Sequence, residues 1–222
     1  MRGRLIVFEG GEGAGKSTQL RRLSARLTAT GIAHAHFREP GGTPVGDRIR
    51  EILLHGNAPM AARTEAALFI ASRAELVATA VRPALERGDH VLLDRFLLST
   101  YAYQIHGRGL PEEVVRTANA LATDGLVPDL TLLLTLRPSE GLQRAGARSA
   151  ADRIERAEAE FHEKVAAAFA RFAEPSWQAA HPECGPIVAI PGEGDVDRIE
   201  AQVLREVSTR LPAMTLDGAG AR

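Results

Sequence analysis

Short apolar runs alternate along this chain with longer stretches whose apolar residues recur at helical spacing. The apolar runs predict five strands, at residues 5–8, 32–37, 90–93, 130–136 and 186–190, and the first run contains β-branched residues. Helical spacing predicts helices at 45–54, 63–86, 111–122, 157–180 and 196–211, with further helices after the first strand, around 99–104 and from 138. This alternation predicts an α/β fold, a five-stranded parallel sheet wrapped by helices.

We expect residues 1–211 to form a single domain and the small, polar residues 212–222 to be a disordered tail. Residues 144–156 hold many arginines and few large apolar residues, which predicts an exposed, mobile segment.

Composition narrows the possible functions. The 27 basic and 28 acidic residues give a net charge of −1, which argues against a nucleic-acid partner. The single cysteine, Cys184, excludes an internal disulfide, so we expect a reducing, cytoplasmic location. No apolar run approaches the roughly 20 residues of a membrane span, so no membrane association is expected.

The sequence GGEGAGKS at residues 10–17 carries the clearest chemistry, because it fits the pattern G-x-x-x-x-G-K-[ST] between a predicted strand and a predicted helix. Glycines let backbone N–H groups surround a phosphate, and the helix N-terminus adds partial positive charge. Lys16 can then reach terminal phosphates, and the Ser17 hydroxyl can bind Mg²⁺. The alternative is a glycine-rich turn before a surface lysine. It does not explain why a predicted strand precedes the motif and a predicted helix follows it.

A second phosphate site is suggested by surplus arginines at strand ends and in loops. These are Arg38, Arg50, Arg73, Arg95, Arg108, Arg148 and Arg153. A kinase with a phosphorylated acceptor needs such a site, and guanidinium groups bind phosphate by two-point contacts. Arg95 is the first candidate, because it directly follows a buried strand and Asp94. The chain has no N-K-x-D segment, which argues against a guanine-specific GTPase.

A base-reading site is suggested by side chains at helical spacing. A spacing of four residues places Ser99 beside Tyr103 and Thr100 beside Gln104, and it places Phe69 beside Arg73. An aromatic ring, a planar cation, an amide and hydroxyls could together read a nucleobase. Core packing remains the alternative for both aromatic residues.

From residue 4 to residue 211 the chain resembles the bacterial thymidylate kinase family of nucleoside monophosphate kinases. The resemblance is carried by FEGGEGAGKST at 8–18, REPGGTPVGDRIR at 38–50, LFIASRAEL at 68–76, DRFLLSTYAYQ at 94–104, GRG at 107–109, PDLTLLL at 128–134 and FHEKV at 161–165. It implies a P-loop kinase fold and Mg²⁺-dependent transfer of phosphate from ATP to dTMP, giving dTDP for dTTP biosynthesis. It also implies a homodimer.

The resemblance implies which residues form each site. ATP would be held by Gly10, Gly11, Glu12, Gly13, Ala14, Gly15, Lys16, Ser17 and Thr18. The dTMP site would contain Glu12, Arg38, Arg50, Phe69, Arg73, Arg95, Ser99, Thr100, Tyr103 and Gln104. The catalytic groups would be Lys16, Asp94, Arg95 and Arg148, and Mg²⁺ would be bound by Ser17 and Asp94.

Within that site the resemblance implies separate roles. Arg95 would hold the dTMP phosphate, with Arg50 and Arg38 nearby. Phe69 would stack on thymine. The polar edge of the thymine base would be read by Arg73, Thr100 and Gln104. Tyr103 would leave no room for a ribose 2′-hydroxyl, and Glu12 would approach the 3′-hydroxyl or the metal. Arg148 would come from a lid at 144–156, since the phosphate loop has no arginine of its own.

Three positions depart from the family pattern, and the first, Gly11, makes the phosphate loop unusually rich in glycine. Gly146 stands where some relatives carry a further lid arginine, and Phe96 replaces a Tyr or His. Two alternatives stay open at this point: a kinase for another nucleoside monophosphate, and a P-loop regulator that binds nucleotide without catalysis.

Overall fold

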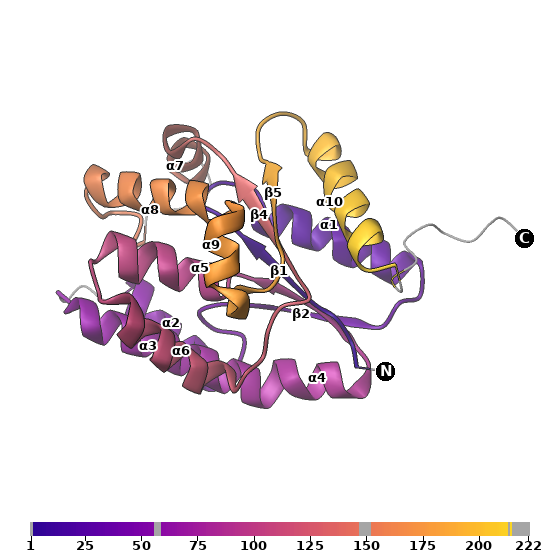
Figure 1. Ribbon diagram of the computed structural model, residues 1–222, viewed down its shortest axis with the longest axis horizontal. Helices are drawn as coiled ribbons and strands as arrows, with labels where there is room; N and C mark the ends of the chain where they lie inside the picture. The colour runs from indigo at the N-terminus through magenta and orange to yellow at the C-terminus, as the bar shows by residue number, and fades with distance from the viewer. Residues whose placement is uncertain (1, 56–58, 147–151, 213, 215–222) are drawn as a thin grey trace, which may run out of the picture.

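A sheet of five parallel strands runs through the middle of the protein (Figure 1). The computed structural model describes residues 2–55, 59–146, 152–212 and 214. The strands lie in the order β2-β3-β1-β4-β5. Their bounds are β1 Leu5–Glu9, β2 His34–Arg38, β3 His90–Asp94, β4 Leu130–Thr135 and β5 Ile187–Pro191. The predicted fold class is therefore confirmed.

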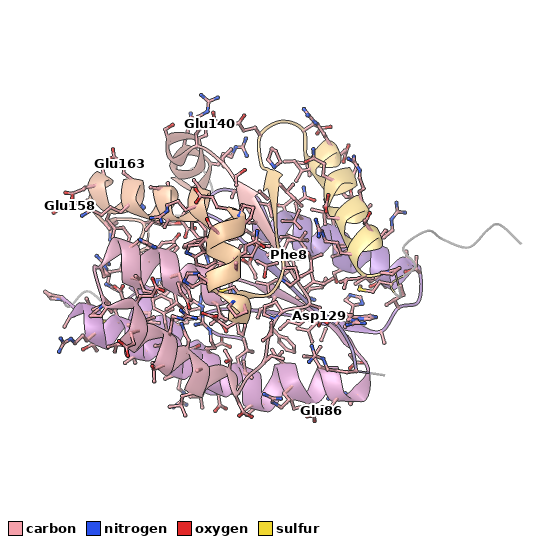
Figure 2. All side chains as sticks on the ribbon, in the orientation of Figure 1. Phe8, Glu86, Asp129, Glu140, Glu158 and Glu163 are labelled. Atoms are coloured by element: carbon pink, nitrogen blue, oxygen red, sulfur yellow. The ribbon has the colours of Figure 1, made fainter. Side chains whose placement is uncertain are left out.

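Helices cover both faces of the sheet, which explains why the central strands are apolar along their whole length. Successive side chains of β1 point to opposite faces: Leu5 and Val7 join one core, and Ile6 and Phe8 join the other. The second core is closed by α1 (Lys16–Ala29) and α10 (Val196–Arg210), which lie together on one face (Figure 1). Figure 2 shows Phe8 on the sheet at the centre of the molecule.

The remaining helical segments are α2 (Pro44–His55), α3 (Ala62–Leu76), the π-helical η1 (Val77–Val81), α4 (Arg82–Arg87), α5 (Leu97–Thr100), the π-helical η2 (Tyr101–Gly107), α6 (Glu112–Thr123), α7 (Pro138–Gly146), α8 (Ala159–Phe172), α9 (Pro175–Ala180) and the 3₁₀ turn η3 (Pro182–Cys184). Of these segments, α2, α3, α5 and η2 contribute walls to a cavity beside the phosphate loop. Among the described residues, none of the helices has the length and apolarity needed to cross a bilayer.

Two predicted helices contain π-helical segments. The helix predicted over 63–86 is a continuous helical path through α3, η1 and α4, and it widens at Val77–Val81. The helix predicted around 99–104 begins at Leu97 and becomes π-helical from Tyr101. A π-helix bonds five residues apart instead of four, so strict four-residue spacing fails there. Such widened turns are frequent at functional sites.

Three other predictions need correction. The helix predicted over 157–180 ends at Phe172, and a new helix begins at Pro175, whose ring cannot continue the preceding one. Residues 152–155 are not exposed as predicted, because Ile154 is buried in the core and its neighbours are partly buried, whereas Arg156 is exposed. In the predicted tail, Met214 is buried beside α10, whereas residues 213 and 215–222 lie outside the described part.

Candidate active site

A glycine loop joins β1 to α1 at the carboxyl edge of the sheet, where parallel α/β proteins bind ligands. Gly13 has φ +68°, and a Cβ atom there would lie 2.0 Å from the carbonyl oxygen of Gly141 in α7. Gly10 has φ +135°, and its Cβ would lie 2.2 Å from the carbonyl oxygen of Leu134. Side chains at these two positions would therefore collide with backbone, which is why the loop needs glycine.

Lys16 is buried at the start of α1, and its ammonium bends back into the loop. Nζ donates hydrogen bonds to the carbonyl oxygens of Gly10 at 3.0 Å and Gly11 at 2.7 Å. Burial, assisted by the positive charge of Arg95, lowers the pKa of Lys16 to about 8. An anion bound in the loop would favour the charged form and raise that pKa again.

The residues predicted to bind Mg²⁺ lie in contact. The Ser17 hydroxyl donates a hydrogen bond to Oδ2 of Asp94 at 2.5 Å, so the two ligands converge from α1 and the end of β3. Hydroxyl and carboxylate oxygens suit Mg²⁺, which commonly takes one or two protein ligands together with substrate phosphates. Across the described ranges no group of three or more His, Cys, Asp or Glu side chains is placed to hold a metal.

Arg95 occupies the turn directly after β3 with φ +72°, a conformation rare for residues other than glycine. Its Nη1 donates to the Gly10 carbonyl at 3.1 Å and to the Ser99 hydroxyl at 3.0 Å, and its Nη2 pairs with the Glu12 carboxylate. Burial alone would lower the pKa of Arg95, but Glu12 and other negative neighbours raise it overall. The guanidinium is thus a permanent cation between the loop and the neighbouring cavity.

Two cavities meet at this cation. The larger one, about 320 Å³, is of the size that holds a small ligand. The smaller one, about 210 Å³, lies along the loop and contains Lys16, Ser17 and Asp94. Both cavities are lined by Glu12, Glu39, Arg50 and Arg95. A ligand in each cavity would therefore touch the same group of charged side chains.

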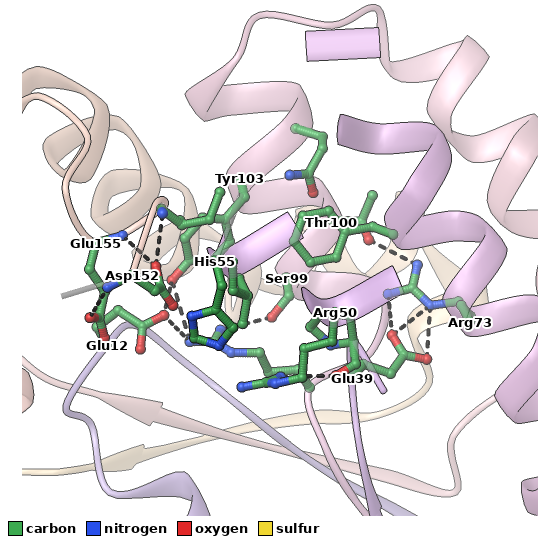
Figure 3. A pocket seen from close by; sticks show the side chains of 16 residues that line it. Glu12, Glu39, Arg50, His55, Arg73, Ser99, Thr100, Tyr103, Asp152 and Glu155 are labelled. Carbon is green, nitrogen blue, oxygen red and sulfur yellow. Dashed lines mark hydrogen bonds and ion pairs between the residues drawn. The ribbon is translucent and has the colours of Figure 1, made fainter. Parts of the chain in front are cut away.

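Most of the predicted acceptor residues line the larger cavity (Figure 3). They are Glu12, Arg50, Phe69, Arg73, Arg95, Ser99, Thr100, Tyr103 and Gln104. Arg38 lines the loop cavity instead. The fold thus brings together residues from the loop, α2, α3 and the helix after Arg95, whether or not each one contacts a nucleotide.

Arg73 is bound more completely by the protein than sequence reasoning suggested. Its Nε and Nη2 donate to the Glu39 carboxylate at 2.6–3.2 Å, and Nη2 also donates to the Phe96 carbonyl at 2.8 Å. Its Nη1 donates to Thr100 Oγ1 at 2.8 Å and Asn119 Oδ1 at 2.6 Å. These contacts use all five N–H donors. A base could be read by Arg73 only if one contact were exchanged.

Other predicted phosphate-binding arginines lie elsewhere. Arg108 and Arg153 both pair with the buried carboxylate of Glu65, at 3.0 Å and 2.7 Å, and neither lines the two cavities. Gln104 also donates to Glu65, at 3.1 Å. Arg148 falls outside the described residues.

Sequence reasoning missed three buried carboxylates. Glu9 accepts hydrogen bonds from the backbone N–H groups of Phe96 and Ser99 and from the Ser99 hydroxyl, and so fixes the helix after Arg95. The position of Glu9 at the end of an apolar strand could have indicated a site residue, because ligands bind at the carboxyl ends of parallel strands. Glu39 carried the same signal, because it directly follows β2, whereas Glu65 lies inside α3 and its partners come from distant segments.

A strand–loop–helix phosphate site beside a second, cation-walled cavity defines a P-loop nucleotide kinase with separate donor and acceptor sites. A model of the thymidylate kinase family matches residues 8–181. Thymidylate kinase from Deinococcus radiodurans is 45% identical over 208 residues, 94% of this chain and 98% of the relative. The Synechococcus enzyme is 46% identical over 95% of this chain and 97% of its own length. A relative from Leifsonia xyli is 50% identical over 78% of this chain and 83% of its own. The chain belongs to the thymidylate kinase family, as the resemblance implied.

Proposed function

We propose that the protein transfers the γ-phosphoryl group of ATP to the phosphate of dTMP, producing dTDP and ADP for dTTP biosynthesis. The observation that carries this assignment is the shared wall of the two cavities, Glu12, Glu39, Arg50 and Arg95. It allows a donor phosphate in the loop to face an acceptor phosphate in the larger cavity. The choice of dTMP is supported by the names of the relatives.

On the donor side, residues 10–18 hold the ATP phosphates. The Lys16 ammonium leaves the Gly10 and Gly11 carbonyls and bridges terminal phosphate oxygens, while backbone N–H groups at the start of α1 bind the remainder. Ser17 and Asp94 fit a Mg²⁺ ion, which would neutralise phosphate charge when bound. Arg148 completes this side from the lid segment 144–156.

On the acceptor side, Arg95 binds the dTMP phosphate, with Arg50 and Arg38 close by. Phe69 stacks on thymine, and Thr100 and Gln104, together with Arg73, form the polar wall at the base edge. Tyr103 and Ser99 lie beside the sugar and the phosphate, and Glu12 faces the 3′-hydroxyl. Tyr103 donates a hydrogen bond to Glu12 at 3.1 Å, which fixes the wall that a ribose 2′-hydroxyl would meet.

The reaction needs no general base, because the attacking phosphate oxygen is already ionised at neutral pH. Catalysis then consists of holding donor and acceptor in line and neutralising charge on the transferred group. Arg95 and Lys16 supply that charge from the two cavities. Closure of the lid would exclude water, which otherwise competes as acceptor.

We also propose that the enzyme is a cytoplasmic homodimer built from single-domain chains. Support comes from apolar side chains exposed on helices that pack against α3. Ile52 in α2 is 52% exposed, and Val114 and Leu121 in α6 are 64% and 84% exposed. Pairing of two chains through these helices would bury them. Sedimentation of the purified protein checks this, since a monomer at micromolar concentration contradicts it.

A product assay tests the proposed reaction. Purified protein with ATP and Mg²⁺ receives dTMP, dUMP, UMP, CMP, AMP or GMP separately, and the diphosphate formed is measured. We expect dTDP to form far faster than any other product, and Lys16→Met to reduce that rate about 100-fold or more with the fold intact. Faster turnover of another monophosphate would contradict the base-reading residues, and no transfer at all would favour a regulator.

A further inference from the structure

The turn at residues 152–156, the C-terminal end of the lid segment, closes on itself through reciprocal hydrogen bonds. The Asp152 carboxylate accepts from the backbone N–H groups of Ile154 at 2.8 Å and Glu155 at 2.9 Å, and the Glu155 carboxylate accepts from the N–H of Asp152 at 3.0 Å. This arrangement corresponds to a capping box, which holds one helical turn rigid. Asp152, Ile154 and Glu155 line the acceptor cavity, and Figure 3 shows Asp152 and Glu155 near Glu12.

Arg153 attaches this turn to two other elements without lining the cavity itself. Its backbone N–H donates to the Leu54 carbonyl at 3.1 Å, and its Nε donates to the Leu53 carbonyl at 2.7 Å. These carbonyls lie in the last turn of α2, which leaves carbonyl groups without partners inside the helix. Nη2 lies 2.7 Å from Oε2 of Glu65 in α3, an ion pair too bent to count as a hydrogen bond.

Glu65 joins a third element to the same point. Its carboxylate is 1% exposed and also accepts from Arg108 at 3.0–3.1 Å and from Gln104 at 3.1 Å. Burial alone would raise the pKa of Glu65, but its arginine partners lower it overall, so the group stays ionised. Arg108 lies over the ring of Phe161 at 4.3 Å, which ties α8 to this cluster. The Glu65 carboxylate thus connects four elements of the structure: turn 152–156, α2, α3 and η2.

We propose that Arg153 is a positioning residue for the acceptor nucleotide: it holds turn 152–156, the C-terminal end of the lid segment, as a fixed wall of the acceptor cavity. The proposal rests on the acceptor role given above to that cavity. It predicts that the acceptor site is shaped before ATP binds. Loss of the attachment should therefore weaken dTMP binding and admit water to the transferred phosphate.

Kinetics of Arg153→Met test the proposal. Glu65 keeps Arg108 and Gln104 in this variant, so its charge remains compensated and the fold should persist. We expect the KM for dTMP to rise about tenfold or more and the KM for ATP to stay within twofold, because a displaced wall misplaces only the acceptor. We also expect more ADP than dTDP. A merely structural role would lower the thermal midpoint without separating the two KM values.

Two further variants make the result decisive. Arg153→Lys keeps the charge but cannot reach the Leu53 carbonyl and Glu65 together, so its KM for dTMP should be intermediate. Arg210→Ala breaks an exposed pair with Glu206 on the far helix α10 and should match wild type. Should Arg153→Met not fold, calorimetric dTMP binding to Arg153→Lys without ATP replaces the kinetics, with weaker binding expected.

The outcomes separate the two proposals. Wild-type protein that neither binds nor phosphorylates dTMP contradicts the proposed function and the role of Arg153 with it. Wild-type protein that turns over dTMP, with both Arg153 variants unchanged in dTMP affinity and in the ratio of ADP to dTDP, overturns the role of Arg153 alone.

Discussion

Arg95, at the end of β3, pairs with Glu12 of the phosphate loop and so links the acceptor cavity to the donor loop through one guanidinium–carboxylate contact. The Gly10 carbonyl strengthens the link, because it accepts hydrogen bonds from both Arg95 and Lys16. The cations proposed for the two phosphates therefore share one acceptor, the Gly10 carbonyl, when no nucleotide is bound. Phosphates that enter the cavities would compete with these acceptors.

The first prediction concerns Arg95. Arg95→Lys keeps a positive charge but removes the two-point contact with phosphate. Loss of one of the two charge-assisted hydrogen bonds, about 1.5–3 kcal/mol, should raise the KM for dTMP roughly 10- to 100-fold. Arg87→Lys, at an exposed pair with Asp89, is the matched control and should behave as wild type in steady-state assays. Equal KM values for the two variants would refute the assignment of Arg95.

Substitutions of Phe69 test whether its ring stacks on the base or only packs in the core. Phe69→Ala should raise the KM for dTMP about tenfold or more, since stacking of one base on an aromatic ring contributes about 1–3 kcal/mol. The KM for ATP should not change. Phe69→Leu keeps apolar volume but removes the ring, so it should show most of the same loss. If only the thermal midpoint falls in both variants, Phe69 is a packing residue.

The lowered pKa of Lys16 predicts that the protein takes up a proton when ATP binds. Burial lowers the pKa of Lys16 from 10.5 to about 8, so above pH 8 the ligand-free protein holds this amine mostly neutral. ATP favours the charged form, so binding at pH 8.5 should take up a proton, and the uptake should fade toward pH 7. Calorimetry in two buffers of different ionisation enthalpy measures it. Identical enthalpies at pH 8.5 would exclude this titration.

Substitution of Gly141 tests whether the close approach of α7 to the phosphate loop matters for ATP binding. A Cβ atom at Gly141 would lie 2.2 Å from the carbonyl oxygen of Glu12, so Gly141→Ala must push the helix and loop apart. We expect kcat/KM for ATP to fall about tenfold or more, because a shift near 1 Å misplaces the donor phosphates. Gly146→Ala is the control in the same helix, because a Cβ there would meet no atom of the described residues within 4 Å beyond its own helix and neighbours. Matching values for the two variants would show that the contact is unimportant.

The sequence was sufficient for the sheet and for most side chains that line the cavities. Apolar runs located the strands, and the position of Arg95 after a buried strand placed it at the sheet edge. The π-helical turn at Tyr101–Gly107 could not be foreseen, because apolar spacing near 3.6 residues does not reveal an inserted residue. Pro175 was a readable helix boundary that the alanine-rich pattern obscured.

The partners of buried charges were beyond sequence reasoning. Arg73 is satisfied by Glu39, Thr100 and Asn119, which come from three different segments of the chain. Arg153 seemed available for phosphate because its partner Glu65 lies far away in sequence. Only tertiary packing decides whether an arginine faces a ligand or a buried carboxylate.

The proposed phosphotransfer is tested most directly by following the γ-phosphate of ATP into the products. The protein would be mixed with Mg²⁺, dTMP and ATP labelled in the γ-phosphate, and the labelled products separated over time. We predict that label appears in dTDP, with one ADP formed for each dTDP and little inorganic phosphate. Label that goes to inorganic phosphate at the same rate with or without dTMP, or that stays in ATP, would contradict the proposed phosphotransfer.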